Sequence, residues 1–148
     1  MSKVYVFGHK NPDNDAIMSS VVLSQLLNQV GYNGDTYEVR RLGPLPAESA
    51  KLLADNGIEN AQIVGVVDHH RFGGFTTAAP LHIIAMPWGS SCTIVRRLFS
   101  VLGVEPTREQ ATLLLAAMMT DTLMLKSPTA TPVDATIAHE LGDKIGVD

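Results

Sequence analysis

The sequence predicts an α/β fold, built on a mostly parallel sheet with helices on both of its faces. Short apolar segments rich in β-branched residues alternate along the chain with segments of helical length. Apolar residues make up 45% of the 148 residues and charged residues 18%, which suffices for a core without disulfides or structural zinc. Such alternation is typical of parallel sheets, in which functional groups gather beyond the carboxyl ends of the strands. We therefore expect a single domain spanning residues 1–148.

The first half of the chain contains two predicted strands and two predicted helices. Residues 4–7 (VYVF) are short, apolar and β-branched, as in a buried strand. After a polar loop, residues 16–30 have the length of a helix, with Asp15 as its expected N-cap. Residues 37–42 are predicted to form the second strand and residues 46–56 the second helix.

The second half of the chain contains two more strands and three more helices. Residues 62–67 (QIVGVV) form the third predicted strand, and residues 81–86 form the fourth. Each following helix is preceded by a side chain that can cap it: Ser90 or Ser91, Thr107 with the Thr-x-x-Gln pattern of a capping box, and Thr131 before Pro132. These helices are expected to end near residues 102, 119 and 146.

Composition excludes several classes of protein. A net charge of −4 argues against nucleic-acid binding driven by overall charge, since proteins that bind in this way usually carry an excess of positive charge; a local basic groove stays open as an alternative. The single cysteine, Cys92, excludes an intrachain disulfide. No stretch approaches 18 consecutive apolar residues, and the N-terminal apolar run is too short for a signal peptide. We therefore expect a cytoplasmic protein with no membrane partner.

The first polar cluster, G-H-K-N-P-D-N-D at residues 8–15, lies where the first strand ends and the first helix begins. His9, Asp13 and Asp15 place one imidazole and two carboxylates within seven residues, and such groups can converge on a cation. The structural alternative is that Asp15 caps the helix while Asp13 is a solvated turn residue.

The second polar cluster, D-H-H-R at residues 68–71, directly follows a predicted strand. Adjacent histidine side chains point in different directions, so one can bind a metal while the other faces a substrate. Three of the five histidines lie in these two clusters, which argues against chance placement. His82, in an apolar strand, and His139, on an amphipathic helix, are interpreted as structural.

The third candidate is Asp121, which follows a long apolar helix. Burying a lone charge is costly, so this carboxylate needs a cation or hydrogen-bond donors. Lys126 is the structural alternative as a partner, and a metal ion is the preferred one.

The three clusters together offer imidazole and carboxylate ligands without a nearby thiolate. Structural zinc sites usually contain thiolates, whereas this set suits manganese, with cobalt or magnesium as alternatives. The number of acidic ligands indicates two ions, the arrangement that hydrolyses phosphoanhydrides and phosphodiesters. His70 and Arg71 would then hold phosphate oxygens. Residues 89–92 (GSSC) lack the hydrolase nucleophile elbow and are interpreted as a helix N-terminus that could bind phosphate.

These motifs resemble those of the family II inorganic pyrophosphatases, which belong to the DHH phosphoesterase superfamily. The matching segments are G-H-K-N-P-D-N-D at 8–15, V-V-D-H-H-R at 66–71 and T-D-T-L-M-L-K-S-P-T at 120–129. R-L-G-P at 41–44 and W-G-S-S-C-T at 88–93 are similar to further family segments. The resemblance covers nearly the whole chain. It implies a DHH-type domain with two manganese ions that hydrolyses pyrophosphate to two phosphates.

The resemblance also implies a role for each polar residue. The metal ligands form two sets: His9 and Asp13 on one ion, and Asp15, His69 and Asp121 on the other. The remaining groups lie around the substrate: His70 as the catalytic residue on the electrophilic phosphate, Arg71 and Lys126 as weaker phosphate ligands, and Asp68 behind the metal ligands or in place of a bridging aspartate.

Two departures from the family pattern predict an incomplete enzyme. Family members carry an earlier strand ending in V-D-H-N, whose aspartate bridges both metals. Its absence, with an apparent gap near residues 64–65, indicates a fragment, an internal deletion or a removed insert. The family's C-terminal domain, with Ser-Arg-Lys residues that grip the substrate, is also missing from this chain. One subgroup has cystathionine-synthase-type regulatory domains inserted near this gap. Adenine nucleotides would be ligands only if the parent protein has that insert.

Three functions remain open at this point. The first is the metal-binding domain of a manganese-dependent inorganic pyrophosphatase, paired as a homodimer by family resemblance. The second is a phosphodiesterase or exopolyphosphatase of the same superfamily. The third is a metal-binding or dimerisation remnant without turnover.

Overall fold

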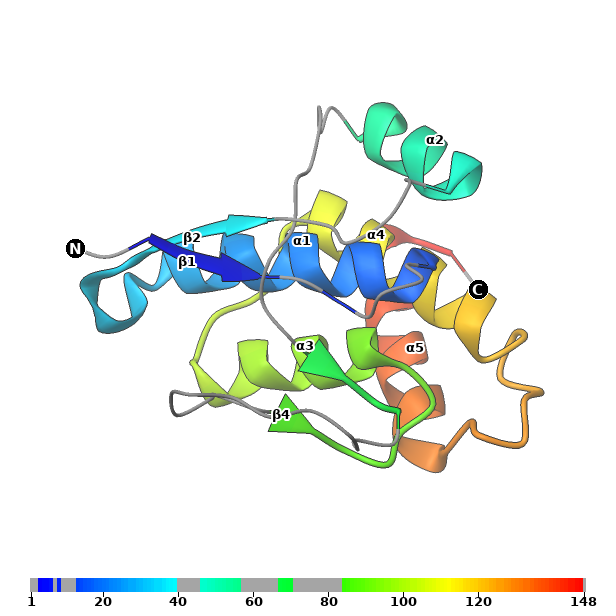
Figure 1. Cartoon of the computed structure of the whole chain (residues 1–148). Coiled ribbons are helices and arrows are strands. Elements are labelled where there is room, and N and C mark those ends of the chain that lie inside the picture. The colour runs from blue at the N-terminus through cyan, green and yellow to red at the C-terminus, as the bar shows by residue number, and fades with distance from the viewer. Residues whose placement is uncertain are drawn as a thin grey trace.

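The computed structural model describes residues 3–6, 8, 13–39, 46–56, 67–70 and 84–147, and these form short strands and longer helices. In chain order the elements are β1 (Lys3–Val6), α1 (Asn14–Gln29), η1 (Tyr32–Gly34), β2 (Thr36–Val39), α2 (Ala47–Asp55), β3 (Val67–Asp68), β4 (Ile84–Ala85), α3 (Ser91–Val101), α4 (Arg108–Asp121) and α5 (Pro132–Ile145). Helix α1 runs through the middle of the molecule, with β1 and β2 along one side and α3 and α4 packed against it, while α5 packs against α4 and α3 (Figure 1).

All strand pairs in the described part of the chain are parallel. β1 pairs with β2, placing Lys3 opposite Thr36, and β3 pairs with β4, placing Val67 opposite Ile84. Parallel neighbours need a long crossover, and α1 provides it between β1 and β2. The predicted α/β class with parallel strands is therefore confirmed.

The strands start close to where the sequence predicts them, but they are short. β1 and β2 each begin one residue before the predicted strand. Of the predicted strands at 62–67 and 81–86, only residue 67 and residues 84–86 are described; residue 67 belongs to β3, and residues 84 and 85 form β4. His82, interpreted above as structural, lies outside the described residues.

Asp13, rather than Asp15, caps α1. The Asp13 Oδ1 atom accepts a hydrogen bond from the Ala16 N–H at 2.9 Å, so the helix begins at Asn14, two residues earlier than predicted. Asp15 lies inside the first turn and is buried. The predicted N-cap at Asp15 is wrong because the N-terminus of another helix, α3, binds this carboxylate.

The predicted caps of the last three helices are confirmed. Each capping side chain accepts a hydrogen bond from a backbone N–H group two or three residues further on: Ser90 from Cys92, Thr107 from Gln110 and Thr131 from Asp134. Helix α5 ends at Gly146, whose φ of 75° lies in the left-handed region that glycine adopts without strain. These local signals fix where α3, α4 and α5 begin.

The core lies between α1 and the helices α3, α4 and α5. Its largest fully buried side chains come from all four helices: Ile17, Met18, Leu26, Ile94, Phe99, Leu113, Leu114, Met118 and Leu141. Each such side chain contributes roughly 1.5–3 kcal/mol on burial. This packing sets the first turn of α1 beside the last turn of α4 (Figure 1). None of the helices in the described ranges combines the length and apolar character needed to cross a membrane.

Gly8 allows the end of the first strand to lie close to α1. A Cβ atom at this position would lie 2.5 Å from the Ala16 Cβ and 2.9 Å from the Ala16 backbone. Any larger residue would push the chain away from the first turn of α1. The glycine therefore helps to place Asp15, one residue before Ala16, at the strand end.

Candidate metal centre

Three of the predicted metal ligands come together in the structure. One ligand atom from each of Asp15, His69 and Asp121 lies within 4.8 Å of the other two. Asp15 comes from the first turn of α1, His69 directly follows β3, and Asp121 is the last residue of α4. The fold thus gathers side chains from three distant parts of the sequence at one point.

Asp15 is held by the N-terminus of α3. Its Oδ1 atom accepts hydrogen bonds from the Ser90 hydroxyl and, at 3.0 Å, from the Cys92 N–H. Its Oδ2 atom accepts one from the Ser91 N–H at 2.8 Å and lies 3.9 Å from His69 Nε2. The N–H groups of Ser91 and Cys92 therefore bind a carboxylate of the chain itself, and the prediction that they bind phosphate is wrong. Because Oδ2 accepts only one hydrogen bond, it is the Asp15 oxygen that can still bind a further ligand beside His69 and Asp121.

His69 is oriented by a backbone carbonyl. Its Nδ1 atom lies 3.1 Å from the Trp88 carbonyl oxygen, which only accepts, so Nδ1 carries a proton and donates. The Nε2 atom is thereby turned toward Asp121, whose Oδ2 lies 3.1 Å away. A histidine that donates one ring N–H to a carbonyl and presents the other nitrogen is the usual arrangement of a metal ligand.

The atoms that face each other at this point fit a bound cation. His69 Nε2 and Asp121 Oδ2 are both buried, and among the described residues neither has a hydrogen-bond partner beyond their own 3.1 Å approach to each other. Two buried polar atoms that face only each other leave bonding capacity unused, so such a pair favours a ligand bound to both. Imidazole nitrogen and carboxylate oxygens are donors that suit manganese. The residues present therefore fit a divalent metal ion.

The charges at the centre also favour a cation. Burial, together with the nearby Asp121 carboxylate, raises the pKa of Asp15 above its usual value, and the hydrogen bonds from residues 90–92 oppose this only in part. Within the described ranges, the only cationic side chain at ion-pair distance from either carboxylate is His69. A divalent ion would relieve the repulsion between the two acidic groups.

The protonation of His69 predicts how metal binding depends on pH. Burial lowers the pKa of His69, but the contacts with Asp121, Asp15 and the Trp88 carbonyl outweigh it and raise the pKa to about 9. The metal-free ring is thus protonated at neutral pH, and a metal must displace the Nε2 proton. We expect the apparent affinity for Mn²⁺ to rise about tenfold per pH unit up to about pH 9 and then level off. Calorimetry in buffers of different ionisation enthalpy should detect about one released proton per ion; an affinity independent of pH would contradict this.

The end of α4 has an unusual backbone. Leu123, Met124 and Leu125 follow Asp121 with φ values of 50°, 56° and 62°, in the left-handed region that non-glycine residues rarely adopt. Thr122 supports this turn, since its hydroxyl accepts a hydrogen bond from the Leu125 N–H at 3.1 Å and donates one to the Met118 carbonyl. The turn ends the helix at Asp121 and so fixes the position of this carboxylate.

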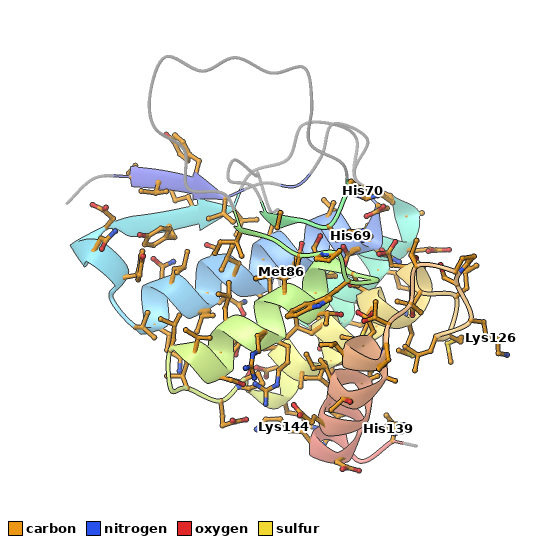
Figure 2. All side chains as sticks on the ribbon, turned by 90° about the horizontal axis from the view of Figure 1, so that it is seen from below. His69, His70, Met86, Lys126, His139 and Lys144 are labelled. Carbon is orange, nitrogen blue, oxygen red and sulfur yellow. The ribbon has the colours of Figure 1, made fainter. Side chains whose placement is uncertain are left out.

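Three other predicted site residues, Asp13, His70 and Lys126, are not part of the three-residue cluster. Asp13 caps α1 and is not part of the three-residue cluster. His70 is exposed, and its ring centroid lies 4.2 Å from that of His69 (Figure 2). Lys126 is exposed and extends from the edge of the molecule, away from His69 (Figure 2). It therefore does not occupy the place of a metal ion beside Asp121.

The side chains of three predicted residues fall outside what the structure describes. His9 and Arg71 lie beyond the described residues, and Asp68 is described only as part of the backbone of β3. Their predicted roles stay predictions. Sequence reasoning also missed two groups that hold the ligands, the Ser90 hydroxyl and the Trp88 carbonyl. Two signals pointed to this region: the predicted helix N-terminus at residues 89–92 and the similarity of W-G-S-S-C-T to a family segment.

The fold and the centre together define a class of protein: a parallel α/β domain with a buried imidazole–carboxylate cluster that fits a divalent metal. Comparison with known families agrees with this class, because the model of the DHH family, N-terminal domain, matches residues 3–118. The chain therefore belongs to the DHH family.

Relatives within this family carry a consistent name. A Brevibacillus brevis protein, 36% identical over 179 aligned residues, and an Exiguobacterium protein, 38% identical over 176, are both named probable manganese-dependent inorganic pyrophosphatases. Each alignment includes all of this chain, but the chain spans only 57% of the length of these relatives.

Solved structures show the same relationship. The chain matches a Methanococcus jannaschii protein assigned to the family II inorganic pyrophosphatases, with a TM-score of 0.79 and 29% identity, over 100% of this chain and 57% of that one. An exopolyphosphatase-related protein from Bacteroides fragilis matches with a TM-score of 0.62 and 22% identity, over 99% of this chain and 53% of that one. The second likeness concerns the fold alone.

Proposed function

We propose that this chain is the metal-binding domain of a manganese-dependent inorganic pyrophosphatase, which hydrolyses pyrophosphate to two phosphates. The observation that carries the proposal is the buried meeting of His69 Nε2 and Asp121 Oδ2, two atoms whose only close polar contact in the described part of the chain is with each other. The names of the relatives supply the reaction, since they are described as manganese-dependent inorganic pyrophosphatases.

Asp15, His69 and Asp121 would hold one manganese ion, and His9 with Asp13 would hold a second. When bound, manganese supplies Lewis-acid activation of the phosphoryl group and of the attacking water. His70 is exposed beside His69, so its ring can reach a phosphate oxygen of a substrate at this centre. Arg71 and Lys126 would contribute weaker phosphate contacts, and Asp68 would act behind the ligands or as a substitute bridge. Cobalt or magnesium could replace manganese.

We also propose that the chain lacks part of the catalytic domain of its relatives, near residues 64–65. The supporting observation is the alignment length: 179 and 176 aligned positions accommodate only 148 residues of this chain. A homodimer and a cytoplasmic location are part of the same proposal. Adenine nucleotides would bind only if the parent protein carries a regulatory insert.

The experiment that tests this function is a substrate comparison on a completed chain. A chimera would take the missing aligned positions and the C-terminal portion from the Brevibacillus brevis relative, and phosphate release would be measured with Mn²⁺. We expect pyrophosphate to be the preferred substrate over tripolyphosphate and dinucleotides. The matched Asp121→Asn chimera should be inactive, because this substitution replaces one of the carboxylates of the three-residue cluster with a neutral amide.

Two results would contradict the proposal. A chimera that prefers tripolyphosphate or dinucleotides would support the second superfamily function, an exopolyphosphatase or phosphodiesterase. A folded chimera without turnover on any of these substrates would indicate a metal-binding remnant.

A further inference from the structure

Asp134 is a fully buried carboxylate on α5 that is not one of the metal ligands. Its Oδ2 atom accepts hydrogen bonds from the Gly89 N–H at 2.9 Å, the Thr131 N–H at 2.7 Å and the Thr131 hydroxyl at 2.6 Å. Its Oδ1 atom accepts one from the Thr93 hydroxyl at 2.5 Å. The bonds from Thr131 form the capping box of α5, whereas those from Gly89 and Thr93 reach across to a different part of the chain.

Gly89 and Thr93 lie at the two ends of the segment that holds the metal ligands. The Trp88 carbonyl, next to Gly89, orients the His69 ring. Between Gly89 and Thr93, three donors from residues 90–92 bind the Asp15 carboxylate. Asp134 therefore binds the 88–93 segment on both sides of the groups that hold Asp15, and at Gly89 directly beside the Trp88 carbonyl that orients His69.

The packing around Gly89 leaves no room for the segment to shift toward α5. A Cβ atom on Gly89 would lie 2.9 Å from Asp134 Oδ2, 3.0 Å from the Ala130 Cα and 3.0 Å from the Thr122 Cγ2. Thr122 directly follows Asp121, the third ligand. The segment thus lies in contact both with the start of α5 and with the end of α4.

Hydrogen bonds keep the Asp134 carboxylate in its ionised form. Burial alone would raise the pKa of Asp134, but the bonds from Thr131, Thr93 and Gly89 outweigh it and hold the pKa below its usual value. The carboxylate is therefore ionised at neutral pH, and hydrogen bonds to an ionised acceptor are roughly twice as strong as neutral ones. A capping box alone would need only the donors of Thr131.

We propose that Asp134 is a positioning residue of the metal centre: it holds the 88–93 segment so that His69 Nε2 and Asp15 Oδ2 meet at one point. This inference rests on the metal centre of the proposed function and does not depend on which phosphate compound is the substrate.

The test compares Asp134→Asn with Asp143→Asn, which removes the same charge from an exposed position on the same helix. Mn²⁺ titrations followed by electron paramagnetic resonance would be run at a temperature below the unfolding transition of each variant. We expect Asp134→Asn to weaken Mn²⁺ binding about 10- to 100-fold, the range typical of residues that orient metal ligands. Asp143→Asn should match the wild type within about twofold, in keeping with its exposed position.

The line shape of the Mn²⁺ spectrum at saturating metal separates positioning from stability. A purely structural role would lower the unfolding temperature and leave the spectrum of the loaded, folded protein unchanged. We expect the spectrum of Asp134→Asn to change, because the geometry of the ligands changes. A folded Asp134→Asn protein with wild-type affinity and spectrum would overturn the proposal.

Thr93→Val decides the question if Asp134→Asn fails to fold. This change keeps the shape of the side chain and removes one of the four hydrogen bonds to Asp134. We expect Mn²⁺ binding to weaken several-fold, against no change for Thr136→Val, an exposed threonine on α5. Wild-type affinity in Thr93→Val would overturn the proposal. A wild-type chain that binds no Mn²⁺ would overturn both proposals, whereas Mn²⁺ binding without pyrophosphate turnover would count only against the proposed function.

Discussion

Asp15→Ala is expected to weaken Mn²⁺ binding to this chain by more than about a hundredfold. Loss of a residue that only orients a metal ligand typically weakens binding by about 10- to 100-fold. The substitution removes one of the two carboxylates of the three-residue cluster, and water cannot replace its charge. It also leaves three donors at the N-terminus of α3 without their acceptor. We therefore expect an additional loss of about 1–3 kcal/mol in the free energy of unfolding.

Asp121→Asn separates the loss of Mn²⁺ affinity from the loss in the free energy of unfolding. It too removes a carboxylate of the cluster, but it leaves the hydrogen bonds of Asp15 in place, so the loss in unfolding free energy should be smaller. Calorimetric titration with Mn²⁺ and denaturant unfolding would be measured for both variants, with Asp143→Ala as the exposed control. Wild-type Mn²⁺ affinity in Asp15→Ala would remove this residue from the ligand set.

The 148-residue chain by itself is expected to hydrolyse pyrophosphate at least about a hundred- to a thousandfold more slowly than the completed chimera. The loss of a single preorganised electrostatic contact typically has a cost of this size, and several are expected to be missing together. Asp55 is a poor substitute for a bridging aspartate, because it is exposed at the end of α2 and paired with Lys51 at 2.5 Å.

A phosphate-release assay with Mn²⁺ and pyrophosphate, run on the chain and the chimera side by side, measures this difference. The Asp121→Asn forms of both proteins provide the background rate. Equal rates for the chain and the chimera would contradict the expectation. They would assign the bridging role to a carboxylate that the chain already has, with Asp68 as the first candidate.

The helices could be predicted well because their limits depend on local chemistry. Thr107, Thr131 and Gly146 act within three or four residues of their own positions, so the sequence alone contains the information. The first helix is the exception. Asp13 and Asp15 are both suitable caps, and the choice between them depends on α3, which binds Asp15 from 75 to 77 positions away.

The candidate site could be predicted in part. Asp15, His69 and Asp121 could be named because each follows an apolar element, and a parallel fold brings such positions together. The groups that hold them could not be named. The Trp88 carbonyl has no side-chain signature, and nothing local distinguishes Asp134 from an ordinary capping-box residue. Its bonds to Gly89 and Thr93 depend on how α5 packs beside α3.

The hydrogen bonds of Asp15 have a consequence for the charge of a loaded centre. Because its Oδ1 is already bound by two donors, Asp15 offers one oxygen, and the three residues together offer three donor atoms. Two carboxylates and a neutral imidazole balance the charge of one divalent ion. A manganese ion held by these three groups would therefore form an electrically neutral unit with about half of an octahedral shell left for exchangeable ligands. The attraction of a highly charged anion to this protein must then come from positive charge outside these three ligands.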